Sequence, residues 1–225
     1  MWNRALYRDR RDAGRQLADR LQNYRDEDPI VIGLPRGGVE VAFEIARALN
    51  APLDVIVSRK LGAPDQPELG IGAVAQGGIL FLDESLVRTL GIADHEIESI
   101  AERERDEMRR RATEYRGSED LPDLKGKTVI LVDDGLATGV TSRAAILAAR
   151  SRNPRRIILA VPVCAPETDT ELAGDVDELV CLHTPDRFIA VGFWYQNFGQ
   201  TTDAQVIELL EEARGEVSRE EISEI

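Results

Sequence analysis

The chain has 225 residues, of which 43% are hydrophobic and 31% charged, enough for one large domain but too few for two full folds. Its 28 Lys and Arg residues against 41 Asp and Glu residues give a formal net charge of −13. An acidic surface repels phosphate backbones and anionic lipid, so we expect no nucleic-acid and no membrane partner. Any anion that the protein binds requires a local basic pocket.

The sequence predicts a cytoplasmic protein. No run approaches the roughly 18 apolar residues of a membrane span, and Arg and Asp occupy the N-terminal stretch where a signal peptide needs an apolar centre. The only cysteines, Cys164 and Cys181, lie in or beside apolar runs. This indicates reduced core thiols rather than a zinc cluster.

Short apolar runs alternate with helical periodicity, which predicts an α/β fold with a mostly parallel sheet covered by helices on both faces. The N-terminal half is expected to contain a helix that ends near residue 24, then a strand at 29–35, a helix at 39–49, a strand at 52–58, an irregular mobile loop at 60–70 and a hairpin turn at 76–78. The second half is expected to contain a helix at 93–116, a strand at 128–134, a helix at 140–152, strands at 155–163 and 177–184, and a terminal helix from 203 to about 214.

The most informative run is VILVDDGLATGVTS, residues 129–142. It delivers two adjacent carboxylates to a strand end and then turns through glycines into a helix, whose first backbone N–H groups and dipole favour a phosphate. Two acids before a phosphate cradle suit a ligand that also carries hydroxyl groups or brings a divalent cation, as a phosphorylated sugar does. The alternative is an ordinary strand-to-helix turn capped by Asp.

In this run the chain resembles the type I phosphoribosyltransferase family, which uses phosphoribosyl pyrophosphate (PRPP). The resemblance implies that Asp133 and Asp134 hold the ribose hydroxyls. It implies a 5′-phosphate loop made of Ala137, Thr138, Gly139, Val140 and Thr141. It also implies a need for Mg²⁺, brought by PRPP rather than held by a definite protein ligand.

Two further segments match the family more loosely. In GLPRGGVEVA, Arg36 can bind phosphate oxygens while Gly37 and Gly38 allow the backbone to approach a ligand, as in the family's pyrophosphate loop. Arg59 and Lys60 stand at the end of the second strand, where several relatives contact pyrophosphate before a loop that closes over the reaction. Arg59 and Lys60 can instead be ordinary exposed charges at a strand end, and PRGG alone is a weak signal because βα turns often contain glycine.

The run DRFIAVGFWYQNFGQTTD, residues 186–203, corresponds to the hood with which the family recognises its base. Phe188 is the first candidate to stack on a nucleobase, with Trp194 and Tyr195 behind it. An aromatic mini-core is the alternative for each of the three. Ala137 stands where oxopurine-type relatives carry an acid assigned to proton transfer, which argues against hypoxanthine or guanine salvage by that route.

The expected function is transfer of ribose 5-phosphate from PRPP to a nitrogenous base in nucleotide salvage, with Asp133, Asp134, Arg59 and Lys60 as the catalytic set.

We expect a single domain over residues 1–225, with a core at 26–183 and a hood and C-terminal helix at 184–225, together with a β-hairpin insertion that carries the mobile loop. The resembling family implies a homodimer. The main rival is a regulatory protein that senses PRPP or a nucleotide without turnover. A second alternative takes Asp133 and Asp134 as the metal-binding acidic pair of a receiver-like or phosphatase-like domain. That alternative leaves the GLATG turn unexplained.

Overall fold

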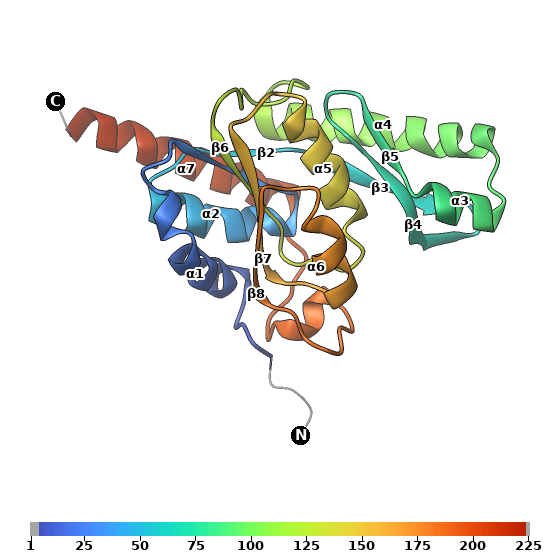
Figure 1. Cartoon of the computed structure of the whole chain (residues 1–225). Coiled ribbons are helices and arrows are strands. Elements are labelled where there is room, and N and C mark those ends of the chain that lie inside the picture. The colour runs from blue at the N-terminus through green and yellow to red at the C-terminus, as the bar shows by residue number, and fades with distance from the viewer. Residues whose placement is uncertain (1–4, 224–225) are drawn as a thin grey trace.

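A computed structural model describes residues 5–223 and contains a five-stranded sheet with all strands parallel (Figure 1). The strand order is β2 (Leu53–Val55), β1 (Pro29–Gly33), β6 (Thr128–Val132), β7 (Arg156–Val163) and β8 (Glu178–His183). Every residue of β1 and β6 is buried, as expected for strands covered on both faces. The predicted parallel α/β fold is therefore confirmed.

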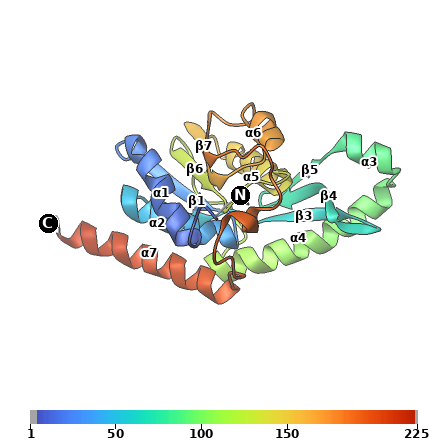
Figure 2. The ribbon, with the colours of Figure 1, turned by 90° about the horizontal axis from the view of Figure 1, so that it is seen from below.

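Alternate residues of β1, β6, β7 and β8 pack into two separate cores. Val31, Ile130 and Ile158 face a core that they share with α1 (Arg10–Arg20), α2 (Gly37–Leu49) and α7 (Asp203–Ser223). Ile32 and Leu131 face the opposite core, which contains α5 (Val140–Arg150) and α6 (Pro166–Leu172). The period-two alternation of apolar side chains thus places helices on both faces of the sheet, as Figures 1 and 2 show.

A second, antiparallel sheet has the order β3 (Ser58–Ala63), β4 (Gln66–Ala75) and β5 (Ile79–Leu82). It lies between α5 and the long helix α4 (Asp94–Arg116), with α3 (Glu84–Leu90) near its far end (Figure 2). The predicted hairpin at 76–78 connects β4 to β5 and is confirmed. The expectation of an irregular loop at 60–70 is wrong, because most of that segment forms strands β3 and β4.

The Gly and Pro content of this hairpin has a packing explanation. A Cβ atom on Gly62 would overlap the carbonyl oxygen of Pro67 on the opposite strand, so the glycine lets the two strands approach at an irregular register. The same residues that suggest a loop in the sequence therefore permit a tight, bulged strand pair.

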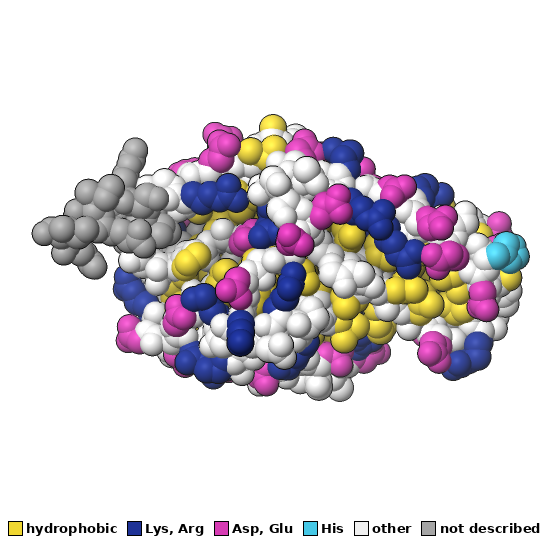
Figure 3. Space-filling model, turned by 90° about the horizontal axis from the view of Figure 1, so that it is seen from above, with side chains coloured by type: hydrophobic (Ala, Val, Ile, Leu, Met, Phe, Trp, Pro, Cys, Tyr) yellow, Lys and Arg dark blue, Asp and Glu magenta, His cyan; other side chains and the backbone are white. Residues whose placement is uncertain are grey.

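The remaining elements are short or terminal. The first helix is followed by a 3-10 turn, η1 (Gln22–Tyr24), and the hood contains η2 (Val191–Trp194). Helix α3 was not predicted, and α7 extends beyond residue 214. None of the helices within residues 5–223 is long and apolar enough to cross a membrane. Acidic and basic side chains are interspersed over the face of the molecule in Figure 3 rather than gathered into separate areas.

Candidate active site

The turn between β6 and α5 lies at the carboxyl end of the central strand. Asp133 and Asp134 follow the buried residues of β6 directly, and the amide of Asp134 donates to Oδ1 of Asp133 over 2.8 Å. Gly139 precedes α5 with a φ of 68°, and a Cβ there would come within 2.8 Å of side-chain atoms of Thr168 and Leu172. Glycine is thus required for the turn to pass beneath α6 and begin α5.

The predicted phosphate loop is open to solvent. Ala137 and Thr138 are exposed and Thr141 is half-buried, while the Thr168 hydroxyl donates to the carbonyl of Ala137 from α6. The first amides of α5 have no carbonyl four residues earlier within the helix, so they are available to an anion at this end. The turn therefore combines two acids with a helix N-terminus only a few residues away.

The acidic pair is only partly exposed, and its environment raises both pKa values. Burial raises the pKa of the Asp133 carboxyl well above its ordinary value, and the charge of Asp134 adds to the shift. Burial also raises the pKa of Asp134, although Arg10 opposes this with Nε 2.7 Å from Oδ2. The Tyr195 hydroxyl donates to the Asp134 carbonyl over 2.6 Å. The pair is therefore held in place while one face remains accessible.

The PRGG turn packs against the acidic pair from β1. The Leu34 amide donates to the Val132 carbonyl over 2.8 Å, and the Pro35–Arg36 peptide bond is cis. A Cβ on Gly38 would lie 2.6 Å from the Val132 carbonyl oxygen, and one on Gly37 would overlap the Asp134 carboxylate. Both glycines were expected to make room for a ligand; in the structure they make room for the neighbouring turn.

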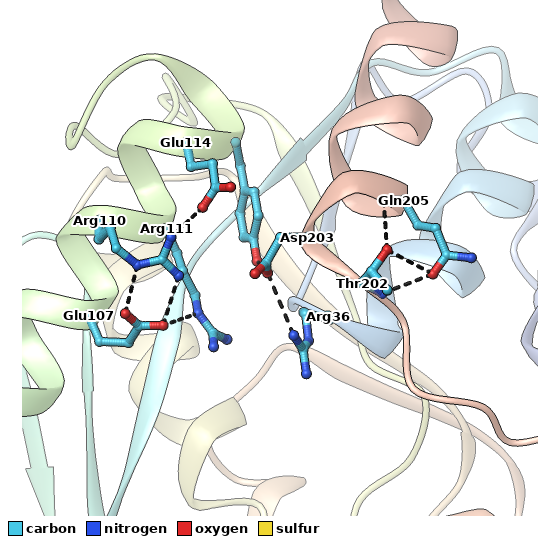
Figure 4. Close-up of polar contacts among 9 residues, drawn as sticks. Arg36, Glu107, Arg110, Arg111, Glu114, Thr202, Asp203 and Gln205 are labelled. Carbon is cyan, nitrogen blue, oxygen red and sulfur yellow. Dashed lines mark hydrogen bonds and ion pairs between the residues drawn. The ribbon is translucent and has the colours of Figure 1, made fainter.

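Arg36 points into the space between α4 and the start of α7 (Figure 4). Its Nη1 lies 3.8 Å from Oδ1 of Asp203, which also accepts a hydrogen bond from the Tyr115 hydroxyl. Arg111 of α4 points toward the same end of this space and is held by Glu107 over 2.7 Å. Arg36 thus has a long and partly exposed ion pair with Asp203 as its restraint, one position before the glycine that lies against Asp134.

Strand β3 sends Arg59 and Lys60 to opposite faces of the small sheet. Arg59 faces α4, where Nε and Nη2 lie 3.0 and 2.7 Å from Oε2 of Glu104. Arg59 and Lys60 both line a groove of about 680 Å³ between the hairpin and α4. The stem of Lys60 lies on the α5 side, since a Cβ on Gly70 would be 3.2 Å from both Lys60 Cδ and Val140 Cγ2. The Lys60 stem thus also comes near Val140 of the predicted phosphate loop.

The aromatic residues of the hood divide into buried and accessible rings. Trp194 and Tyr195 are 3% and 5% exposed and pack in a cluster with Tyr7, so neither presents an open ring face to a nucleobase. Phe188 is half-buried at the edge of this cluster, and Phe198 is 37% exposed. Stacking by Trp194 or Tyr195 would require the cluster to open, whereas Phe188 keeps part of its ring accessible.

Arg10 is the site residue that the sequence did not reveal. It is 7% exposed and reaches Asp134 across 124 positions of sequence. The N-terminal segment before it pairs with the hood, where the Tyr7 amide donates to the Trp194 carbonyl over 3.0 Å. The one available signal was its position: a cation in the first turn of a helix opposes the helix dipole.

The fold and this turn are those expected of a phosphoribosyl transferase domain. A family model described as phosphoribosyl transferase domain matches residues 5–196, so the chain belongs to that family.

Individual relatives agree with this assignment. Two Mycobacterium tuberculosis proteins, "Putative phosphoribosyl transferase MT0597" from strain CDC 1551 / Oshkosh and "Putative phosphoribosyl transferase Rv0571c" from strain H37Rv, are each 45% identical over 208 residues. The match covers 92% of this chain and 47% of each relative, so the chain spans about half the length of these curated relatives. The crystal structure of TT1426 from Thermus thermophilus is 45% identical with a TM-score of 0.77, covering 92% of this chain and 98% of that one.

Proposed function

We propose that the protein transfers ribose 5-phosphate from PRPP to a nitrogenous base and releases pyrophosphate, with Mg²⁺. The observation that carries this proposal is the β6–α5 turn, which brings two carboxylates and a helix N-terminus to one open edge of the parallel sheet. The proposal includes nucleotide salvage by a homodimer, on the family resemblance, and a single domain in the cytoplasm, on the length and composition of the sequence.

In this proposal the carboxylates and the N-terminus of α5 bind different parts of the sugar phosphate. Asp133 and Asp134 accept hydrogen bonds from the ribose hydroxyls, while the backbone of residues 137–141 and the hydroxyls of Thr138 and Thr141 bind the 5′-phosphate. The base nitrogen attacks the anomeric carbon as the bond to pyrophosphate breaks, so positive charge develops on the ribose next to the acids. Phe188 is proposed to stack on the incoming base.

Arg36 and Lys60 are proposed to bind the leaving pyrophosphate. Each is restrained by an acid in the ligand-free chain, Arg36 by Asp203 and Lys60 by Glu68. Both ion pairs are long and partly exposed, so exchanging them for a phosphate costs little. Arg59 can bind pyrophosphate only by releasing Glu104. Its ion pair with Glu104, at 2.7 Å, is shorter than those of Arg36 and Lys60.

The proposal has PRPP bring the magnesium ion rather than a dedicated protein site. Among residues 5–223 no group of three or more His, Cys, Asp or Glu side chains gathers to hold a metal ion. Mg²⁺ usually keeps several waters and is bound largely through substrate phosphates, which PRPP supplies. When bound, the ion would neutralise charge on the leaving pyrophosphate.

Pyrophosphate release from PRPP with a panel of purine, pyrimidine and other nitrogenous bases tests the proposal. We expect turnover with at least one base in the presence of Mg²⁺, and none from the Asp133→Asn/Asp134→Asn double variant while it remains folded. Calorimetric binding of PRPP without turnover of any base would favour the sensing alternative. Full activity of the double variant, or no binding of PRPP at all, would refute the site.

A further inference from the structure

Arg10 occupies a position that helix stability does not explain. It is the first residue of α1, whose N-terminus is already capped by Asp9 accepting from the Asp12 amide over 2.8 Å. A cation in the first turn meets the positive end of the helix dipole, and burying a guanidinium costs free energy unless it is well paired. Arg10 is nonetheless 7% exposed. Such a local conflict points to a role outside the helix.

The partners of Arg10 come from three distant parts of the chain. Nε lies 2.7 Å from Oδ2 of Asp134, and Nη1 donates to the Gly199 carbonyl over 2.6 Å. The guanidinium lies 3.9 Å from the centroid of the Phe198 ring, and Glu40 is 3.8 Å from Nη1. One side chain therefore binds the acidic pair with one edge and the hood segment at 198–199 with another.

We propose that Arg10 is a positioning residue, which orients the Asp134 carboxylate toward the ribose hydroxyls and ties it to the C-terminal segment at 198–199. The inference rests on the proposed function for the substrate, but the Arg10–Asp134 linkage itself does not. Arg10 does not touch the sugar in this arrangement; it acts through Asp134.

The charges around Asp134 make the guanidinium necessary. Burial raises the pKa of Asp134 most strongly, and the charge of Glu40 from α2 raises it further. Tyr195 contributes only a hydrogen bond to the Asp134 carbonyl. Arg10 is thus the one cation that faces Asp134 among the described residues and lowers its pKa by both charge and hydrogen bonding.

The space for this pair is built into the fold. A Cβ on Gly37 would overlap Oδ2 of Asp134 and lie 2.7 Å from Nε of Arg10. The first glycine of α2 therefore leaves room for the two side chains at the point where they meet.

The test compares Arg10→Gln with wild type and with a control, Arg8→Gln, which removes a 61% exposed arginine paired with Asp9. The primary readout is the Asp134 carboxyl titration in the ligand-free protein, followed by carbon-13 NMR and assigned with Asp134→Asn. In Arg10→Gln the midpoint should move upward by about one pH unit or more, because an opposite charge at this distance lowers a carboxyl pKa by roughly that amount. In Arg8→Gln it should not move. An unchanged midpoint in Arg10→Gln would overturn the proposal.

Turnover supplies the second readout and separates this proposal from the proposed function. In an active enzyme the acidic limb of kcat/KM should move upward with the Asp134 midpoint, which a merely structural defect would not cause. If wild type has no transferase activity, the proposed function fails while the NMR titration still decides the role of Arg10.

Arg10→Lys keeps the question answerable if Arg10→Gln does not fold. Lysine keeps the charge but cannot donate to Asp134 and Gly199 with a rigid fork. We expect the acidic limb to stay near that of wild type while kcat/KM falls by about ten- to a hundredfold, as small displacements of reacting groups commonly cost. Wild-type kcat/KM in this variant would overturn the orienting role.

Discussion

Gly37 lies directly against the carboxylate of Asp134, and a Cβ at this position would overlap Oδ2. Gly37→Ala should therefore displace the acidic pair, lower the free energy of unfolding by about 1–3 kcal/mol and abolish transfer. Denaturant unfolding and pyrophosphate release measure the two effects. Gly174→Ala is the control, since a Cβ there meets no heavy atom of the described residues within 4 Å. A Gly37→Ala protein as stable and active as wild type would contradict the packing.

Asp133→Asn should stabilise the protein at neutral and alkaline pH while it destroys activity. The folded-state pKa of Asp133 is raised, so the native state binds its proton more tightly than the unfolded state does. Stability therefore falls as the pH rises from the unfolded pKa through the folded one, and the asparagine variant lacks this loss. Melting temperatures measured between pH 4 and pH 8 should diverge, with the variant higher at pH 8. Parallel melting-temperature curves would show that folding does not raise the pKa of Asp133.

Asp134→Asn should stabilise the protein less than Asp133→Asn does. Both carboxyls have raised pKa values, so both variants lose the cost of ionising a buried acid. Asp134→Asn alone leaves the buried Arg10 guanidinium without its closest anion, at 2.7 Å, and the remaining carboxylate of Glu40 is 3.8 Å away. Losing one partner of a buried charge-assisted hydrogen bond costs about 2 kcal/mol. Denaturant unfolding at pH 7 should place this variant below Asp133→Asn. The reverse order would remove the reason for treating the two adjacent acids as different.

Much of the fold could be predicted because its signals are local. The buried run of β6, the acids after it and the glycine turn into α5 are contiguous, so their order along the chain specifies the end of the sheet where they gather. The period of α4 is likewise visible in sequence. Strands β3 and β4 were hidden because Gly62 and Pro67 indicate a loop, whereas packing between α4 and α5 imposes a strand pair.

The side-chain partners could not be predicted for a different reason. Arg10 and Asp134 are 124 positions apart, and nothing in either segment identifies the other. Arg59 and Lys60 are adjacent, and their opposite directions depend on which faces of β3 the helices α4 and α5 cover. The burial of Trp194 follows from Tyr7 and the N-terminal segment, which no local pattern connects with the hood.

Asp203→Asn should strengthen the binding of pyrophosphate. Asp203 lies 3.8 Å from Arg36, and asparagine removes its charge while keeping an oxygen that can accept from the Tyr115 hydroxyl. Because exposed ion pairs contribute up to about 1 kcal/mol, the dissociation constant should fall by a few-fold. Titration calorimetry with inorganic pyrophosphate and Mg²⁺ measures it.

The matched control for that experiment is Asp106→Asn, which removes a 78% exposed acid of α4 that pairs with Arg109. The two variants have the same net charge, so a general change in the field of the protein would affect both equally. Tighter binding in both, or in neither, would show that Asp203 does not compete with pyrophosphate for Arg36.

Lys60 and Arg59 should differ in their importance for transfer. The Lys60 stem lies beside Gly70 and Val140 on the α5 side of the small sheet, and its ammonium is restrained by Glu68 at the hairpin. Lys60→Ala should lower kcat by about 10²–10³-fold, the usual effect of losing one preorganised contact to developing charge. Arg59→Ala should lower kcat by less than about tenfold, because Glu104 holds that guanidinium on the opposite face.

Steady-state pyrophosphate release measures both variants, with the exposed Lys125→Ala as control. Equal losses in the two variants would mean that Arg59 leaves Glu104 during turnover and binds the same leaving group.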